Sequence, residues 1–258
     1  MSILVTTNAA IMTIEIDRPE KKNSINAAMY QRMADAIAQA RADASVRVIL
    51  IRGKQEIFTA GNDLGDFMNA PPSAVTSGST SPVLQFLAQI SQCEKPLVAA
   101  VAGAAVGIGT TMLFHCDLVF AADTTRFHMP FVSLGLVPEA ASSYLLPQIV
   151  GYQRAAHLLL LGEPFDAATG KEAGFVTQVV AADAVFATAE HAAAKLAALP
   201  PKSIRTTKAL MKAGHAAQVA QQMATESGHF RTMLGEPAAR EAFTAFFERR
   251  KPDFSKCQ

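Results

Sequence analysis

The sequence predicts an α/β fold that is followed by a purely helical C-terminal region. Up to about residue 182, helical patterns alternate with strand-length apolar runs, among them VRVILIRG, PLVAAVAG and LVFAA. Such alternation is typical of α/β proteins, whose central strands are buried on both faces. The later segments AAAKLAAL, IRTTKALMKA, QVAQQMATES and EAFTAFFERR show helical patterns only. We therefore expect an α/β core over residues 1–195 and a helical region over residues 196–258.

A hairpin and an amphipathic helix are predicted at the start of the chain. Two β-rich runs, residues 3–7 and 11–17, are joined by NAA. The loop RPEKKNS follows, and its Ser24 is a candidate N-cap for a helix from Asn26 to about Ala42. Apolar residues recur every three or four positions in this stretch, so we expect one buried stripe along the helix.

Two loops with glycines each follow a buried strand. FTAGNDL comes after VRVILIRG, and GAAVGIG comes after PLVAAVAG and leads into a helix that begins near Gly107 or Ile108. A dinucleotide-binding fingerprint is not present, because its third glycine position is Met112. Small residues allow a backbone to approach a ligand closely, so the two loops could each direct one N–H group at a single oxygen. Two tight turns without a ligand are the alternative interpretation.

The segment NAPPSAVTSGSTSP at residues 69–82 separates the first of these loops from a predicted helix over residues 83–92. Its content of Pro, Ser, Thr and Gly indicates a surface loop rather than a domain boundary. Since it follows FTAGNDL directly, one hypothesis is that it acts as a lid over a ligand.

Composition and charge exclude several classes of protein. Half of the residues are hydrophobic, 17% are charged, and the net charge is +1, so no basic face for nucleic acid is expected. No apolar run is long enough for a membrane span, and no signal peptide is recognisable. His115 and His128 lack the spacing of a zinc site, so no metal is expected. The three cysteines form no CxxC motif, and we expect reduced thiols in a cytoplasmic protein.

Glu139 lies in the apolar stretch LGLVPEAASSY, with no basic residue within a helical turn. An ionised carboxylate is costly in such surroundings unless it has a partner. One interpretation is a surface glutamate at the start of a helix whose first residue is Pro138. The other is a carboxylate held in an apolar pocket for proton transfer. The neighbouring Ser142 and Ser143 do not lie in a G-x-S-x-G motif, so a serine hydrolase of that type is not indicated.

Four segments together resemble the crotonase (enoyl-CoA hydratase/isomerase) superfamily over nearly the whole chain. RPEKKNSIN resembles its RP-x-x-x-N-A-L signature, and FTAGNDL resembles its F-x-A-G-x-D loop. AVAGAAVGIGTTMLFHCDLVFAAD is similar to the second loop with its helix and strand, and EAFTAFFERRKPDF is similar to the closing helix. The resemblance implies a crotonase-like spiral of β-β-α turns with a helical C-terminal region used for trimerisation. A homotrimer or a dimer of trimers is therefore expected.

The same resemblance implies a site for an acyl-CoA thioester. The family stabilises a thioester enolate with two backbone N–H groups, which correspond here to those of Asn62 and Ile108. The residues implied on the CoA side of the site are Ala60, Gly61, Asp63, Leu64 and Gly107. No separate cofactor is expected, because coenzyme A is part of the substrate.

Two departures from the family pattern bear on the type of reaction. Hydratases of the family use two glutamates, and the corresponding positions here are Thr111 and Phe131. Neither residue transfers a proton under ordinary conditions. The resemblance therefore argues against ordinary hydratase activity.

One subgroup, the peroxisomal-type 3-enoyl-CoA/2-enoyl-CoA isomerases, places its only catalytic acid in a P-E-G-x-S-S-Y-type segment. VPEAASSYLLPQIVG resembles that segment, although Ala140 and Ala141 follow the glutamate. On this resemblance Glu139 is the acid/base that shifts a 3-enoyl-CoA double bond to 2-trans-enoyl-CoA in fatty-acid β-oxidation. An apolar wall is expected to raise its pKa, formed by Phe131, Leu136 and Val137.

Two other functions remain open from the sequence. One is another crotonase-type reaction, such as hydration, dehalogenation or ring opening of an acyl-CoA, in which Asp63 or Asp66 takes part. The other is a non-catalytic acyl-CoA binder, because one fold supports unrelated functions.

Overall fold

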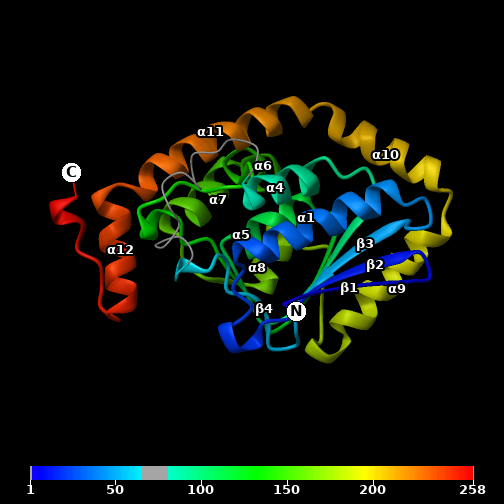
Figure 1. Ribbon diagram of the computed structural model, residues 1–258, viewed down its shortest axis with the longest axis horizontal. Coiled ribbons are helices and arrows are strands. Elements are labelled where there is room, and N and C mark those ends of the chain that lie inside the picture. Colours follow the sequence, from blue (N-terminus) through cyan, green and yellow to red (C-terminus); the bar gives the residue numbers. More distant parts are fainter. Residues whose placement is uncertain (1, 66–80, 258) are drawn as a thin grey trace.

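Two β-sheets form the framework of the molecule, for which the computed structural model describes residues 2–65 and 81–257 (Figure 1). The larger sheet has the strand order β1-β2-β3-β5-β7-β10, and the smaller has the order β4-β6-β8-β9. The larger sheet comprises β1 (Ile3–Asn8), β2 (Ile11–Ile16), β3 (Val48–Arg52), β5 (Leu97–Val101), β7 (Leu118–Ala122) and β10 (Gln178–Val180). The smaller comprises β4 (Ile57–Thr59), β6 (Ala104–Val106), β8 (Arg126–His128) and β9 (Phe165–Asp166). The predicted α/β class and the opening hairpin are confirmed.

Successive pairs of strands divide between the two sheets. The pairs β3 and β4, β5 and β6, and β7 and β8 each place one strand in the larger sheet and the next in the smaller. Strands from different pairs run parallel. Helices follow the pairs, namely α4 (Pro82–Ser91), α5 (Ile108–Thr111) and α6 (Ser142–Val150). This progression confirms the predicted spiral of β-β-α turns, although the sequence patterns did not reveal the three-residue strands of the smaller sheet.

Both faces of the larger sheet are covered, which explains why its strands appear in the sequence as continuous apolar runs. On β3, Ile49 and Ile51 belong to the main core, whereas Val48 and Leu50 belong to a second cluster on the opposite face. This second face is covered by α9 (Val185–Ala198), which buries Val185 and three alanines against it. The main core is completed by α4 and α1 (Ala27–Ala42), which pack against each other.

Asn26, not Ser24, caps the first long helix. The Asn26 side chain accepts a hydrogen bond of 3.0 Å from the backbone N–H of Met29, and α1 begins at Ala27. The Ser24 hydroxyl instead lies 3.5 Å from the Asp63 carboxylate. The predicted cap is therefore wrong by two residues, because the loop bends Ser24 towards the FTAGNDL segment.

The C-terminal part of the chain is helical, as predicted. It contains α9, α10 (Pro201–Ala213), α11 (Ala216–Leu234) and α12 (Pro237–Phe247), and shorter helices α7 (Tyr152–Ala156) and α8 (Ala167–Ala173) precede them. In Figure 1, α10 and α11 extend along one side of the molecule and α12 lies at its far end. The predicted division between residues 195 and 196 falls inside α9, and as a domain boundary it stays a prediction.

Two features of the structure bear on the environment of the protein. Within residues 2–65 and 81–257, no helix is both long and apolar enough to cross a membrane. Cys93, Cys116 and Cys257 are free. The compartment stays a prediction. The lid hypothesis concerns residues 69–82, of which 69–80 lie outside the described part of the chain.

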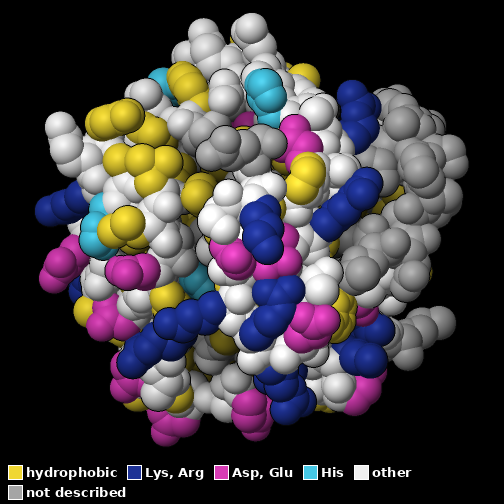
Figure 2. Space-filling model, turned by 90° about the vertical axis from the view of Figure 1, so that its left-hand side faces the viewer, with side chains coloured by type: hydrophobic (Ala, Val, Ile, Leu, Met, Phe, Trp, Pro, Cys, Tyr) yellow, Lys and Arg dark blue, Asp and Glu magenta, His cyan; other side chains and the backbone are white. Residues whose placement is uncertain are grey.

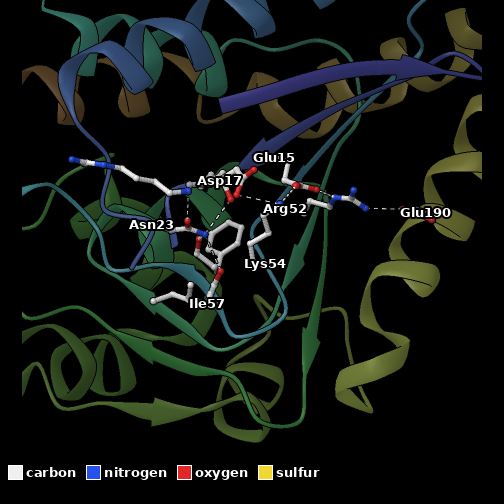
Figure 3. Close-up of polar contacts among 10 residues, drawn as sticks. Glu15, Asp17, Asn23, Arg52, Lys54, Ile57 and Glu190 are labelled. Carbon is white, nitrogen blue, oxygen red and sulfur yellow. Dashed lines mark hydrogen bonds and ion pairs between the residues drawn. The ribbon is translucent and has the colours of Figure 1, made fainter. Parts of the chain in front are cut away.

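Asn23 joins the N-terminal loop to the strand that leads into FTAGNDL (Figure 3). Its Nδ2 donates hydrogen bonds of 3.1–3.2 Å to the carbonyls of Ile16, Ile57 and Phe58, and its Oδ1 accepts one from the backbone N–H of Arg18. Its own carbonyl accepts a hydrogen bond of 2.6 Å from the Thr59 hydroxyl. The side chain is fully buried, so these bonds satisfy groups that water does not reach.

Ion pairs beside this junction connect the sheet to α9 (Figure 3). Arg52 lies 2.6 Å from the Glu15 carboxylate and 2.9 Å from that of Glu190. Lys54 also contacts Glu15, and it lies 3.2 Å from Asp17. Because these side chains are partly exposed, the pairs contribute little free energy, and we assign the positioning of the loop to Asn23.

Replacing Asn23 with Ala should lower the free energy of unfolding by about 3 kcal/mol, because the carbonyls of Ile16, Ile57 and Phe58 lose a hydrogen bond. Alanine is also less favourable than asparagine at the φ of 55° found here. Urea denaturation measures the loss. The matched control is Asn26→Ala, which removes a helix cap and should cost about 1 kcal/mol. Equal losses in the two variants would contradict the role given to Asn23.

Candidate active site

A cavity of about 860 Å³ lies between α1, α4, α6 and α11. Its wall is mostly apolar and carries a small number of polar groups, as is typical of ligand sites. The lining side chains include Ile25, Tyr30, Asn62, Asp63, Leu87, Phe114, His115, Glu139, Leu145, Met223 and Phe230.

Glu139 brings a buried carboxyl group to this cavity. The residue is 8% exposed, and its Oε1 has no hydrogen-bond partner among the described residues. Burial raises the pKa of the carboxyl to about 8, and the nearby Glu226 of α11 acts in the same direction. The carboxyl therefore exchanges its proton close to neutral pH, as general acid/base catalysis requires.

The chain turns sharply between Glu139 and the following helix. Ala140 and Ala141 have left-handed φ values of 61° and 55°, and α6 begins only at Ser142. The interpretation of Glu139 as a surface residue in a helix that starts at Pro138 is therefore wrong. Left-handed alanines are strained, and such strain persists only where surrounding contacts enforce it, often at functional sites.

Tyr30 and Asn62 add a polar pair to the cavity wall. The Tyr30 hydroxyl donates a hydrogen bond to Oδ1 of Asn62. Burial raises the pKa of Tyr30 well above its ordinary value, and Glu139 adds to this increase, so the phenol stays neutral near the carboxyl. The sequence analysis missed Tyr30, because a tyrosine on a helix with a buried apolar stripe carries no signal of its own.

The two glycine-containing loops meet in the structure, as the sequence analysis anticipated. A Cβ atom on Gly61 would lie 2.7 Å from the Val106 carbonyl oxygen, and one on Gly109 would lie 2.5 Å from the Thr59 side chain. Both distances are shorter than any normal contact, so larger residues would force the loops apart. These glycines allow FTAGNDL and GAAVGIG to pack closely against each other.

The two proposed N–H donors are not used by the backbone hydrogen bonds of the described residues. Around Asn62, the bonds run from Ile25 N–H to the Gly61 carbonyl and from Asp63 N–H to the Ile25 carbonyl, at 2.8 and 3.0 Å. Ile108 is the first residue of α5, so its N–H has no carbonyl within that helix to bond. Because α5 has only four residues, the helix dipole expected at Ile108 is small.

The site residues predicted from the sequence divide into those that line the cavity and those that do not. Asn62, Asp63 and Glu139 line the cavity. Asp63 also forms an ion pair of 2.8 Å with Arg18, which fixes the end of the loop. The predicted residues that support the loops without lining the described cavity are Ala60, Gly61, Leu64, Gly107 and Ile108. Phe131, Leu136 and Val137 also lie outside the lining, so the apolar wall consists of other side chains, among them Leu87, Phe114 and Leu145.

At the two positions where hydratases carry glutamates, the structure contains buried residues without a carboxylate. Thr111 is fully buried, and its hydroxyl has no partner among the described residues. Phe131 is 4% exposed. Asp66, considered for other reactions, lies outside the described residues. Within the described ranges, no group of three His, Cys, Asp or Glu side chains could hold a metal ion.

His115 is a second residue that the sequence analysis did not place at the site. Its Nε2 lies 2.8 Å from the Ala140 carbonyl oxygen, which can only accept, so the ring hydrogen is on Nε2. Burial lowers the pKa of His115 to about 4, and the ring is neutral at physiological pH. His115 therefore holds the backbone at Ala140, the residue after Glu139, and does not serve as a metal ligand.

Comparison with known families agrees with this arrangement. The family model described as enoyl-CoA hydratase/isomerase matches residues 6–257. The chain belongs to this family. It is a crotonase-family enzyme, and the crotonase family acts on acyl-CoA thioesters.

Individual relatives carry the names of different reactions. 2,3-Dehydroadipyl-CoA hydratase of Escherichia coli (strain K12) is 29% identical over 98% of this chain and 98% of its own. Enoyl-CoA delta isomerase 2 of Rattus norvegicus is 37% identical over 81% of this chain and 54% of its own. The crystal structure of an enoyl-CoA hydratase/isomerase from Pseudoalteromonas atlantica T6c has 40% identity and a TM-score of 0.93, and covers 99% of this chain and 100% of its own. Similarity alone does not distinguish hydratase from isomerase.

The raised pKa of Glu139 predicts a pH-dependent stability. The ordinary pKa is 4.5 and the folded value about 8, so between them the unfolded chain releases a proton that the folded protein retains. From about pH 5 to about pH 8, the wild type should lose stability relative to Glu139→Gln, by up to about 1.4 kcal/mol per pH unit. Urea unfolding of both proteins over this range measures the difference. Parallel stability curves would contradict the buried environment of Glu139.

Proposed function

We propose that the protein is an enoyl-CoA isomerase that converts 3-enoyl-CoA to 2-trans-enoyl-CoA, with Glu139 as its acid and base. The observation that carries this proposal is a carboxyl group that is buried in the cavity wall and whose Oε1 has no hydrogen-bond partner within residues 2–65 and 81–257. Asp63 is the other carboxylate among the described lining residues, and its ion pair with Arg18 favours a structural role. A double-bond shift needs one proton-exchanging carboxyl.

In the proposed reaction, ionised Glu139 takes a proton from C2 of the substrate. The electron pair of that C–H bond moves into a dienolate, whose negative charge rests on the thioester oxygen. The N–H groups of Asn62 and Ile108 donate hydrogen bonds to this oxygen. Protonated Glu139 then returns the proton to C4, and the double bond moves to C2–C3. Neither water nor a second acid is consumed.

The environment of Glu139 supports this chemistry over hydration. A pKa of about 8 makes the carboxylate a stronger base than an ordinary glutamate, and an apolar wall limits the access of water to the dienolate. Hydration requires a positioned and activated water molecule, whereas Thr111 and Phe131 provide no carboxylate for that task. The loop residues Gly61 and Gly107 remain the proposed side of the site for coenzyme A.

Glu139→Gln should reduce kcat for 3-trans-hexenoyl-CoA by about 10²- to 10⁴-fold, because the amide cannot exchange a proton with carbon. Binding of the CoA ester should persist, since the backbone donors are unchanged. A coupled assay for the 2-trans product measures kcat, and calorimetric titration with the saturated hexanoyl-CoA measures binding. Hydration of crotonyl-CoA is followed in parallel by loss of enoyl absorbance.

Asp63→Asn provides the matched control at the second carboxylate of the cavity. It should retain most of the isomerase kcat, although the loss of the Arg18 ion pair can weaken binding. Near-full activity of Glu139→Gln, or hydration as the dominant wild-type reaction, would overturn the proposal. Binding of CoA esters without any turnover would favour an acyl-CoA binder.

We further propose that the protein assembles as a homotrimer or a dimer of trimers. Phe246 and Phe247 at the end of α12 are 59% and 54% exposed, and on α10 Leu210 is 73% exposed. Figure 2 views the end of the molecule where α12 lies, and hydrophobic side chains gather on one part of this face. Exposed apolar groups of this size mark contact surfaces. Light scattering should give three or six times the chain mass of 27.4 kDa, whereas a monomer would contradict the assembly.

A further inference from the structure

A second buried carboxyl group, that of Glu226 on α11, is bonded to the segment that carries Glu139. Glu226 is 4% exposed. Its Oε2 accepts a hydrogen bond of 2.6 Å from the backbone N–H of Ala141, and its Oε1 accepts one of 2.9 Å from that of Ser143. The Ser143 hydroxyl also bonds Oε1. Glu226 therefore satisfies N–H groups at the start of α6 that no carbonyl of that helix can reach.

Other contacts hold the same segment from the remaining sides. The Ser142 N–H and hydroxyl donate to the Glu139 carbonyl at 3.0 and 2.6 Å. His115 donates to the Ala140 carbonyl. Together with Glu226, these bonds fix the backbone at Glu139 and at the two strained alanines that follow it. The contacts that hold Ala140 and Ala141 in their strained conformation thus come from α6, from the segment that contains His115, and from α11.

Within the described residues, Glu226 is the charged group that acts on Glu139, and burial has the larger effect. Tyr30 on α1 is neutral at physiological pH because its pKa is raised, and His115 is neutral because its pKa is lowered. Lys212 on α10 lies 3.5 Å from the His115 carbonyl, and burial lowers its pKa. For Glu226, burial raises the pKa, while its bonds to Ser143 and Ala141 lower it. Because two of its partners are backbone N–H groups that only donate, we assign the ionised form to Glu226 at neutral pH.

We propose that Glu226 is a positioning residue, which holds the loop that carries Glu139 and whose negative charge adds to the effect of burial on the Glu139 proton. This inference rests on the proposed role of Glu139 as the acid/base. A like charge disfavours ionisation, so it makes the Glu139 carboxylate a stronger base towards C2 of the substrate. The same helix lines the cavity with Met223, Ser227 and Phe230, so one element both forms part of the cavity wall and supports the base.

The test measures the titration of Glu139 directly, without relying on turnover. Protein labelled with ¹³C at the glutamate carboxyl carbons is titrated by NMR, and the Glu139 signal is assigned by its loss in Glu139→Gln. In Glu226→Gln the midpoint of Glu139 should fall by about one pH unit. The matched control is Gln222→Ala, one turn earlier on α11, which removes an uncharged contact of 2.8 Å to the Ser143 hydroxyl. Its Glu139 midpoint should equal that of the wild type.

Glu226→Asp separates charge from position. It keeps the negative charge but shortens the side chain, so the Glu139 midpoint should stay within a few tenths of a unit of the wild-type value. Its kcat should fall, with KM little changed, because the shorter carboxylate cannot bond both N–H groups. A merely structural role would not lower the Glu139 midpoint in Glu226→Gln while leaving it unchanged in Glu226→Asp.

The order of ionisation provides a second measurement if Glu226→Gln fails to fold. In the wild type, Glu226 should ionise at a lower pH than Glu139, because its charge acts on Glu139 only when it is already present. A Glu226 midpoint above that of Glu139, or an unchanged Glu139 midpoint in Glu226→Gln, would overturn the proposal, whether or not the wild type is an isomerase. Coupled midpoints in an enzyme without isomerase activity would support the coupling and overturn the proposed function instead.

Discussion

The burial of one carboxyl group, that of Glu139, is the constraint on which the rest of the site depends. Such a group is costly to place in an apolar wall, and burial favours its protonated form. The chain meets this constraint with two left-handed alanines, a short turn and hydrogen bonds to Ser142 and Glu226. The strained backbone and the buried carboxyl lower the folding stability. In return, the site has a carboxyl that gains and loses a proton near neutral pH.

The two glycine-containing loops, FTAGNDL and GAAVGIG, depend on a different set of contacts, which lies away from the cavity. Asn23 ties β2 to β4, and Gly61 allows FTAGNDL to approach the end of β6 closely. The spiral of strand pairs brings these loops together, because β4 and β6 of consecutive turns pair in parallel. The N–H groups proposed as donors, those of Asn62 and Ile108, thus lie on loops that the fold itself holds in place, and preorganised donors stabilise developing charge at little cost.

The sequence predicted what depends on continuous patterns, namely β3, β5, β7 and the C-terminal helices. It did not reveal β4, β6 and β8, because three residues are too few for a period to appear. Glu139 could be recognised because a lone acid in an apolar stretch is conspicuous and matches a family segment. Glu226 could not, because it lies among polar residues on a helix, and its burial arises only from the packing of α11 on α6. Tyr30 was missed because a tyrosine beside a buried apolar stripe carries no signal of its own, and His115 was missed because its contact with Ala140 arises only in the folded chain.

The central claim is that one buried carboxyl moves the proton from C2 to C4, and isotope transfer tests it most directly. A 3-enoyl-CoA with deuterium at both C2 positions is converted in ordinary water, and early product is examined for label at C4 by mass spectrometry. Because the apolar wall slows exchange of the Glu139 proton with water, the account predicts that a measurable fraction of the product carries deuterium at C4. Complete loss of label to water from the first turnovers, with activity retained in Glu139→Gln, would contradict it.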